Sequence, residues 1–285
     1  MKRFGSRAVA VGALSMGVAA VLGSGVASAS RARVSSSLPT LKVALTGTTG
    51  VSVSGSMVSG AVSVTSTFSG KAPSGPNANG PTVGLVRLNP GVTLQQAAGA
   101  VQSHHGDINA LTPYGALVVD AGAPGTIQTV LTPGNWVALN VTGNTPAFAP
   151  FTVTQSSSPA ALPGAAATQT AIEFAFRGPT VLHNGTIVRA VNGGWLVHMI
   201  DLIGVKSRSD GQKVIALLRA GNDHKAMKLA TSSFVGLLGP ASPGAMQQGV
   251  LQTKAGYYVE ACFMDTLDGR EHTQLGMERL VKVVK

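Results

Sequence analysis

An internal repeat constrains the fold of this chain more than any other feature. The segment 124–128 (Pro-Gly-Thr-Ile-Gln) matches the segment 243–247 (Pro-Gly-Ala-Met-Gln). Further on, 134–140 (Gly-Asn-Trp-Val-Ala-Leu-Asn) matches 256–262 (Gly-Tyr-Tyr-Val-Glu-Ala-Cys) in the same order. A matching order with only small slips in spacing is typical of a duplicated structural unit. The sequence therefore predicts two copies of one domain, each long enough to bury a core of its own.

Short runs of alternating residues predict that both copies are built of β-strands. In the first half, apolar and hydroxyl side chains alternate at 51–54 and 62–65, and glycines are frequent between such runs. A period of two is typical of strands with one buried face. In the second half, the segments 172–176, 186–191 and 195–205 are the candidate strands. We therefore expect an all-β fold.

One short helix is expected in each copy. Thr93, with Gln96 three residues later, has the pattern of a capping box before an Ala-rich stretch. In the second copy, Ser209 or Asp210 can cap a helix that runs through Arg219 and ends near the following glycine. The tripeptide 183–185 (His-Asn-Gly) predicts a hairpin turn, because Asn-Gly favours a two-residue connection.

The N-terminus has the features of a secretory signal. It begins with basic residues, continues with an apolar stretch at 8–21, and reaches small residues at 27–29. The stretch is short and Gly-rich for a membrane span, although a retained N-terminal anchor helix is an alternative. No cysteine follows it that could carry a lipid anchor. We expect a secreted or cell-envelope protein with no transmembrane segment in the mature chain.

The expected domain organisation follows from the repeat and from changes in composition. A segment rich in Ser, Pro, Gly and Ala separates the two copies and is typical of a linker. The expected parts are a signal peptide (1–29), a polar leader (30–39), a first β domain (40–154), the linker (155–168) and a second β domain (169–285).

Charge and motifs exclude several classes of function. Without the signal, three of the 21 basic residues are lost and all 11 acidic residues remain, so the net charge is 18 − 11 = +7. The basic residues are scattered and are not interleaved with aromatic residues, so no nucleic-acid site is expected. The chain has no Gly-x-Ser-x-Gly motif, no phosphate-binding Gly-Lys-Ser/Thr motif and no His-x-His pair. An electron carrier or binding protein is therefore favoured over an enzyme.

The candidate site is centred on the only cysteine, Cys262. A lone thiol in a secreted protein can be buried and inert, can form an intermolecular disulfide, or can bind a metal. Cys262 is followed by His272 and Met277, and His198 lies upstream on an apolar run. A thiolate, two imidazoles and a thioether are the ligand types that select copper.

These residues carry a resemblance to a known family. The segment 256–262, then 268–272 (Asp-Gly-Arg-Glu-His), then 275–277 (Leu-Gly-Met) resembles the end of a cupredoxin domain. The segment 192–198 resembles the earlier strand pair that carries the family's first histidine. The resemblance implies two Greek-key β-sandwiches, the second with one type 1 copper ion. Its ligands would be His198, Cys262, His272 and Met277, and its role would be electron transfer with a redox partner protein of unknown identity.

The first copy departs from this pattern. The repeat places Asn140 at the position of Cys262, and counting back along the strands places Pro81 near the position of His198. The segment after Asn140 is too short to hold counterparts of His272 and Met277. The first copy is therefore expected to be a degenerate, metal-free domain.

The second copy also departs from the pattern at two points. Nine residues separate Cys262 from His272, a longer loop than in small electron carriers. Glu260 shares a strand face with Cys262, where an apolar residue is expected, and a buried unpaired carboxylate is costly. Either this face is open at a domain interface, or Glu260 pairs with a cation such as Arg189, or the site has drifted from copper use.

Two other functions stay open at this point. A metal-free envelope protein could use the same fold as an interaction or structural module, and a copper storage or delivery protein would share the same ligands. Other polar groups are weaker candidates. His104 and His105 beside Asp107 could bind a cation or be solvated, and His224 is expected in a polar loop. The acidic residues of the ligand loop are expected to form a solvated rim: Asp265, Asp268 and Glu271.

Overall fold

The structure is a computed structural model that describes residues 37–72, 80–104, 106–142 and 145–285. The expected signal peptide, most of the polar leader and His105 lie outside these ranges. Among the described residues, no helix combines the length and the apolar character needed to cross a membrane.

The first half of the chain is mostly β-structure with one α-helix and one short 3-10 helix. Its elements are β1 (Thr40–Thr46), β2 (Gly50–Gly55), β3 (Gly60–Ser69), β4 (Thr82–Leu88), α1 (Leu94–Ser103), η1 (Ile108–Leu111), β5 (Gly115–Gly122), β6 (Gly125–Leu131), β7 (Gly134–Asn140) and β8 (Ala147–Val153).

The second half follows a related order with two α-helices. Its elements are β9 (Ala167–Ile172), β10 (Ala175–Arg177), β11 (Val181–His183), β12 (Ile187–Asn192), β13 (His198–Val205), α2 (Arg208–Arg219), α3 (Asp223–Leu229), β14 (Ala230–Ala241), β15 (Met246–Val250), β16 (Gly256–Ala261), η2 (His272–Leu275) and β17 (Glu278–Val284). The limits predicted for the two domains stay a prediction.

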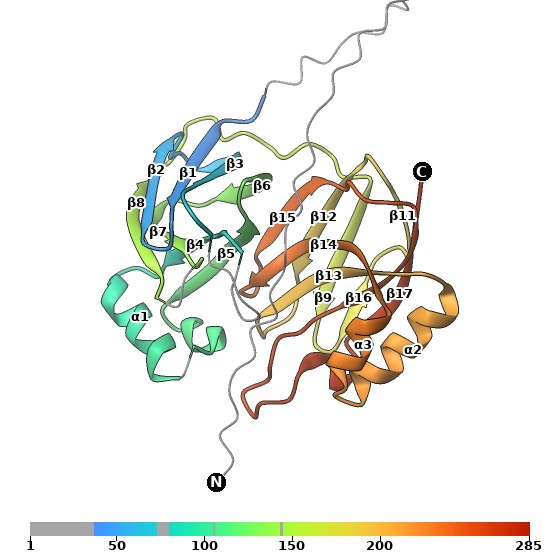
Figure 1. Cartoon of the computed structure of the whole chain (residues 1–285). Helices are drawn as coiled ribbons and strands as arrows, with labels where there is room; N and C mark the ends of the chain where they lie inside the picture. Colours follow the sequence, from blue (N-terminus) through green and yellow to red (C-terminus); the bar gives the residue numbers. More distant parts are fainter. Residues whose placement is uncertain (1–36, 73–79, 105, 143–144) are drawn as a thin grey trace, which may run out of the picture.

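The strand order repeats between the halves, which lie side by side in Figure 1. A four-stranded sheet in the first half has the order β5-β4-β7-β8, and the second half has the equivalent order β14-β13-β16-β17, extended by β11. The remaining strands form one eight-stranded sheet, β10-β9-β12-β15-β6-β3-β1-β2, in which each half supplies four neighbouring strands. This mostly β duplication agrees with the sequence, whereas the Greek-key connection stays a prediction.

Strand register supports the alignment of the two copies. Leu85 on β4 pairs with Ala138 on β7, and Leu202 on β13 pairs with Glu260 on β16. Counting from these pairs places Pro81 at the position of His198, as the sequence predicts. The aromatic residues of β7 and β16 also match. Trp136 Nε1 donates to the carbonyl of the residue four positions earlier, and the hydroxyl of Tyr258 does the same.

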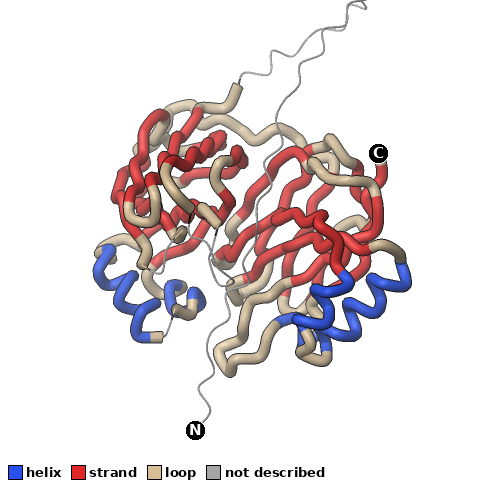
Figure 2. The backbone as a smooth tube through the Cα atoms, viewed as in Figure 1, coloured by secondary structure: helices blue, strands red, loops and turns tan. Residues whose placement is uncertain are grey.

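The central strands of the smaller sheets, β4, β7, β13 and β16, are buried on both faces and are mostly apolar on both sides. In the first half, one face packs against strands β1, β3 and β6 around Leu85 and Trp136. The other face packs against α1 through Val86 and Val137. In the second half, α2 and α3 cover the outer face around Ile203 in the same manner. Figure 2 shows these helices outside the strands of each half.

Strand contacts join the halves in both sheet layers. In the eight-stranded sheet, β6 pairs with β15 at Gln128 and Gln248, whose side-chain amides are 2.9 Å apart. Between the smaller sheets, the end of β14 meets β5, where the backbone N–H of Ser242 donates to the carbonyl of Leu117 at 2.8 Å. The repeat segments at 124–128 and 243–247 therefore meet at the centre of the molecule.

The prediction of one helix per copy is correct for the first half and wrong for the second. Thr93 and Gln96 form the expected capping box of α1. In the second half, α2 begins two residues earlier than expected because Ser207 caps it. After the turn that ends α2, Asn222 begins α3, so His224 lies on a helix and not in a loop. Short polar segments that follow a helix end do not show from sequence alone whether they form another helical turn.

Two expected β features are wrong in detail. The segment 172–176 is not one strand but the turn of the β9–β10 hairpin, at Glu173 and Phe174. The tripeptide 183–185 does form a turn, since the N–H of Thr186 faces the carbonyl of His183 at 3.4 Å. It is not a hairpin, because β11 pairs with β17 and β12 pairs with β9 and β15. The turn therefore links two different sheets.

Glu260 is fully buried and forms an ion pair with Arg279, its cross-strand neighbour on β17. Arg189, the partner suggested by the sequence, instead donates to Gln248 Oε1 at 2.8 Å. Arg279 also donates to Gln169 Oε1 at 2.6 Å. Burial raises the pKa of Glu260 to about 7, and the ion pair with Arg279 opposes this shift. The pair fixes β16 against β17 next to Cys262.

Replacement of Arg279 by methionine should therefore destabilise the protein. At about pH 8 the loss in unfolding free energy should be roughly 3–5 kcal/mol, because the buried Glu260 carboxylate loses its partner. At about pH 5 the loss should be smaller, because Glu260 can then be protonated. Urea unfolding of the wild type and the variant at each pH measures these two losses. Arg189→Met is the matched control and should cost about 1 kcal/mol; equal losses for the two variants would contradict this role of Arg279.

Candidate metal centre

His198 is the first residue of β13 and is fully buried. The preceding turn is held by Asn192, whose side-chain amide donates to the carbonyls of Leu196 and Ala241 at 2.8 and 2.7 Å. The apolar run from His198 to Val205 forms a central strand of the five-stranded sheet, between β14 and β16. The ring is therefore anchored at the end of a buried strand.

Cys262 and His272 both lie in the ligand loop, which we define as residues 262–277, with Cys262 at its first position. Cys262 directly follows β16, and His272 begins η2. Three backbone hydrogen bonds close this loop. The N–H of Cys262 donates to the carbonyl of Met277 at 3.2 Å, that of His272 to Met264 at 2.8 Å, and that of Met277 to His272 at 3.0 Å. The loop is therefore long but tied at its base.

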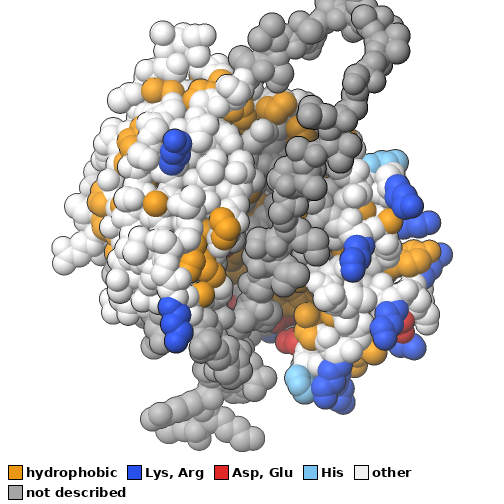
Figure 3. Space-filling view, turned by 45° about the horizontal axis from the view of Figure 1, so that its top comes forward, with side chains coloured by type: hydrophobic (Ala, Val, Ile, Leu, Met, Phe, Trp, Pro, Cys, Tyr) orange, Lys and Arg blue, Asp and Glu red, His pale blue; other side chains and the backbone are white. Residues whose placement is uncertain are grey.

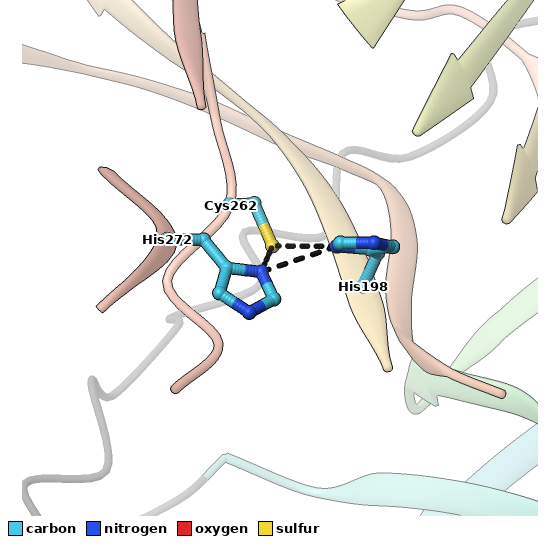
Figure 4. A group of neighbouring side chains, drawn as sticks. All are labelled: His198, Cys262 and His272. Carbon is cyan, nitrogen blue, oxygen red and sulfur yellow. Dashed lines mark hydrogen bonds between the residues drawn. The ribbon is translucent and has the colours of Figure 1, made fainter. Parts of the chain in front are cut away.

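The fold brings three of the four predicted ligands, His198, Cys262 and His272, together (Figure 4). The Nδ1 atoms of His198 and His272 are 3.1 Å apart. The sulfur of Cys262 lies 3.3 Å from Nδ1 of His272 and 3.8 Å from Nδ1 of His198. All three side chains have no exposed surface. Residues 64 and 74 positions apart in the sequence thus meet at one point.

Met277 lies close to this cluster in the fold. Its side chain is fully buried and belongs to the same apolar cluster as Cys262, together with Ile200 and Phe176. Its backbone closes the ligand loop, as described above. Its role as an axial ligand stays a prediction.

The donor set fits a metal ion. In a trigonal arrangement with bonds of roughly 2.0 Å to nitrogen and 2.3 Å to sulfur, neighbouring donor atoms lie about 3.5–3.7 Å apart. The three observed separations, 3.1, 3.3 and 3.8 Å, are close to these values. The sulfur and the two Nδ1 atoms face one another with too little space for a proton on each of them. One cation at the centre of the three atoms can accept a lone pair from every one. The cluster therefore resembles a type 1 copper site.

The turn between β9 and β10 supports both imidazoles from outside. Glu173 Oε1 accepts hydrogen bonds from the backbone N–H groups of Trp195 and Leu196 and lies 3.5 Å from Nε2 of His198. Phe174 has a positive φ of 54° and contacts the ring of His272 edge-on, with centroids 5.2 Å apart. A carboxylate on Nε2 would leave Nδ1 of His198 as the lone-pair donor.

The glycine at position 194 is required by this arrangement. A Cβ atom there would lie 2.3 Å from Glu173 Oε1 and 2.8 Å from Nε2 of His198. Glu173 could not be recognised from the expected strand at 172–176, because the residue lies in the turn between β9 and β10. The signal that could have identified the residue is a single acid within an apolar run, followed by a Gly-Gly pair near a histidine.

The first half also supports the site, through Asn109 of η1. Its Oδ1 accepts from the N–H of Val197, next to His198, at 2.9 Å. Its Nδ2 donates to the carbonyl of Asp265 in the ligand loop at 3.2 Å. Asp107, a candidate cation ligand from the sequence, instead accepts from the backbone N–H of Asn109 at 2.8 Å and caps η1. The first half of the chain thus helps to hold two segments of the candidate site.

Other sequence candidates lie elsewhere. His104 is the C-cap of α1, and its expected neighbour His105 is outside the described residues. Of the acids expected at the rim of the ligand loop, Asp265 and Asp268 are exposed, and Asp268 pairs with Arg270 at 2.9 Å. Glu271 is only half-buried, and burial raises its pKa to about 7.

Burial keeps the three donor groups uncharged in the absence of metal. It raises the pKa of the Cys262 thiol to about 12, although N–H groups such as that of Met199, 3.3 Å from the sulfur, oppose the shift. It lowers the pKa of His272 to about 4, and nearby His198 adds to that effect. Burial lowers the pKa of His198 as well. Both imidazoles therefore have free lone pairs at neutral pH, whereas metal binding must release the thiol proton.

Comparison with known proteins returns copper proteins among the solved structures. Auracyanin from the photosynthetic bacterium Roseiflexus castenholzii is 17% identical, and the match covers 43% of this chain and 100% of that chain with a TM-score of 0.27. Auracyanin A of Chloroflexus aurantiacus, a "blue" copper protein, is 16% identical over 41% of this chain and 99% of that chain, with a TM-score of 0.23.

A copper-containing nitrite reductase from Thermus scotoductus SA-01 is 14% identical over 86% of this chain and 61% of that chain, with a TM-score of 0.24. No protein-family model and no curated protein matches the chain. The TM-scores of these solved structures are low, so they carry no argument about the fold or the site of this chain.

The lowered pKa of His272 predicts a pH-dependent contribution to stability in the metal-free protein. Unfolded imidazoles have a pKa of about 6.5, so between about pH 6.5 and 4 the unfolded state binds more protons than the folded state. Stability must then fall as the pH is lowered through this window. Relative to His272→Asn, the wild type should lose about 1–3 kcal/mol of unfolding free energy between about pH 7 and 4.

Urea unfolding at a series of pH values measures this difference. The comparison with His272→Asn removes the contribution of titrating carboxyl groups, which both proteins share. A difference that is constant over the pH range would show that His272 is protonated as easily in the folded as in the unfolded protein.

Proposed function

We propose that this chain is a secreted or cell-envelope copper protein with a single type 1 site that transfers electrons between partner proteins. The observation that carries the proposal is the convergence of His198, Cys262 and His272 within hydrogen-bonding distances of one another in a fully buried setting. The lack of charge on both imidazoles at neutral pH supports it. The redox partner is a protein of unknown identity.

In this proposal, Nδ1 of His198, Nδ1 of His272, the Cys262 sulfur and the thioether of Met277 would hold the copper ion. Bound copper would supply one-electron redox chemistry. The protein's part is to keep the donor atoms in place in both oxidation states. The strand end that carries His198 and the closed ligand loop serve this purpose, and the N–H of Met199 directed at the sulfur would tune the potential.

Copper reconstitution tests the proposal directly. The metal-free protein should bind one equivalent of Cu(II) and develop the intense blue absorption of a copper–thiolate bond. Cys262→Ser should abolish the colour, because it removes the thiolate. Met277→Leu should keep the colour and shift the redox potential. A colourless protein whose thiol stays fully titratable after copper addition would rule out the type 1 site.

Glu173 gives a second prediction for the same site. Replacement of Glu173 by glutamine should lower copper affinity about 10- to 100-fold, because the carboxylate that orients His198 is lost. Competition with a chelator of known affinity measures the change. Asp268→Asn is the matched control, since Asp268 is an exposed acid of the ligand loop, and should leave the affinity unchanged. An equal affinity for Glu173→Gln and wild type would show that Glu173 does not act on His198.

Copper storage or delivery is the second candidate, and the burial of His272 favours it. The Nε2 atom of His272 is buried and has no hydrogen-bond partner among the described residues. A ligand ring with no exposed edge offers no surface for close contact with a redox partner. Electron self-exchange measured by NMR separates the two functions. Fast exchange supports electron transfer, and negligible exchange with tight copper binding supports storage.

A further inference from the structure

A cavity of about 830 Å³ lies between the two halves of the molecule. Its walls come from β4, β5 and β6 of the first half and from β13, β14 and β15 of the second half. Sequence neighbours of all three predicted ligands line it: Met199 follows His198, Phe263 follows Cys262, and Glu271 precedes His272. Met199 also donates its backbone N–H to the sulfur of Cys262 at 3.3 Å, so the wall of this cavity contacts the candidate metal centre.

The lining is acidic in an otherwise basic protein. The chain has 21 Lys and Arg residues and only 11 Asp and Glu residues. Four of these acids line the cavity, namely Asp120, Asp201, Asp265 and Glu271. No Lys, Arg or His occurs among the described residues of the lining. Figure 3 shows few Asp and Glu side chains on this face of the molecule, and Lys and Arg side chains on both halves. The cavity therefore concentrates carboxyl groups and, among its described residues, has no basic side chain.

Two of the acids are held against β14. Asp201 pairs with Gly236 across the β13–β14 ladder and is only 3% exposed. Asp120, from the first half, lies against Gly239, where a Cβ atom would come within 2.8 Å of its Oδ1. Within the described part of the chain, no hydrogen bond or ion pair is formed by either carboxyl group.

Such a pair of carboxyl groups is costly without a partner. Burial raises the pKa of Asp120 to about 7, and burial and the neighbouring Asp120 raise the pKa of Asp201 well above its usual range. Buried carboxyl groups in proteins normally have a cation or a hydrogen-bond donor nearby. A cation in the cavity would compensate both groups at once.

We propose that this cavity is a cation-binding vestibule through which copper ions reach the buried metal centre. This inference rests on the proposed copper function and adds the route of uptake. The acids are graded along the route: Asp265 is exposed, Glu271 and Asp120 are half-buried, and Asp201 is buried. Met199 and Met264 add thioethers to the same lining, and sulfur and carboxylate groups together accept both oxidation states of copper.

The transfer is a ligand exchange without a redox step. A copper ion gives up oxygen ligands of Asp120 and Asp201 and gains the sulfur of Cys262, whose S–H proton is released to solvent. Because the three ligand side chains have no exposed surface, the ion must pass through a lining of this kind. The two halves are therefore both needed for uptake, although only the second half holds the final site.

The rate of copper uptake tests the vestibule. Stopped-flow mixing of metal-free protein with Cu(II) should give blue colour about tenfold or more slowly in Asp120→Asn/Asp201→Asn than in the wild type, because the attraction of the cavity for cations is lost. The final spectrum should be unchanged. The control Asp210→Asn/Asp268→Asn removes the same charge outside the cavity and should change the rate by less than about twofold. An unchanged rate in the vestibule variant overturns the proposal.

A second experiment does not depend on the copper centre. On a Cys262→Ser background, which disables the centre, Mn²⁺ should still bind at one site, as seen by loss of the free-ion EPR signal. Carboxylate oxygens suit this hard cation. Binding should disappear when Asp120→Asn and Asp201→Asn are added. Absence of Mn²⁺ binding in Cys262→Ser overturns the vestibule, whereas failure of the copper colour alone with Mn²⁺ binding retained contradicts only the proposed copper function.

Discussion

The pairing of β16 with β17 is the constraint on which the candidate site depends. It places Cys262, at the end of β16, opposite Met277, at the start of β17, and the backbone hydrogen bond between them closes the ligand loop at its base. The buried ion pair of Glu260 and Arg279 lies in the same ladder. The strand β13 pairs with the other edge of β16, so the same sheet brings His198, at the start of β13, to the sulfur of Cys262.

The first half supports the candidate site although it carries other residues at two of the aligned ligand positions. The first copy has Pro81 and Asn140 at the positions of His198 and Cys262, and the side-chain amide of Asn140 donates to the carbonyls of Gly47 and Gly50 at 3.0 and 2.8 Å. That amide stabilises a local loop and does not form a site. The first copy nevertheless supplies Asn109 to the base of the ligand loop and completes the eight-stranded sheet.

The features that repeat in the sequence or follow a strict period could be predicted from the sequence alone. The two copies, the β-strands, the capping box at Thr93 and the candidate ligands were all predictable, because each follows from local pattern or resemblance. Partners across strands were not, since Arg279 and Arg189 are equally plausible until the register is known. The Glu173 turn was also missed, because its function depends on contacts with residues about twenty positions away. The helix α3 was missed because it is short and polar.

The most direct test of the central claim is X-ray absorption spectroscopy of the copper-loaded protein, which reports the atoms bonded to the metal. We predict one sulfur and two nitrogen neighbours from imidazole in the first coordination shell, with the sulfur contribution lost in Cys262→Ser. A shell of oxygen and nitrogen atoms alone, unchanged in Cys262→Ser, would contradict the claim that the buried thiol and both imidazoles bind one copper ion.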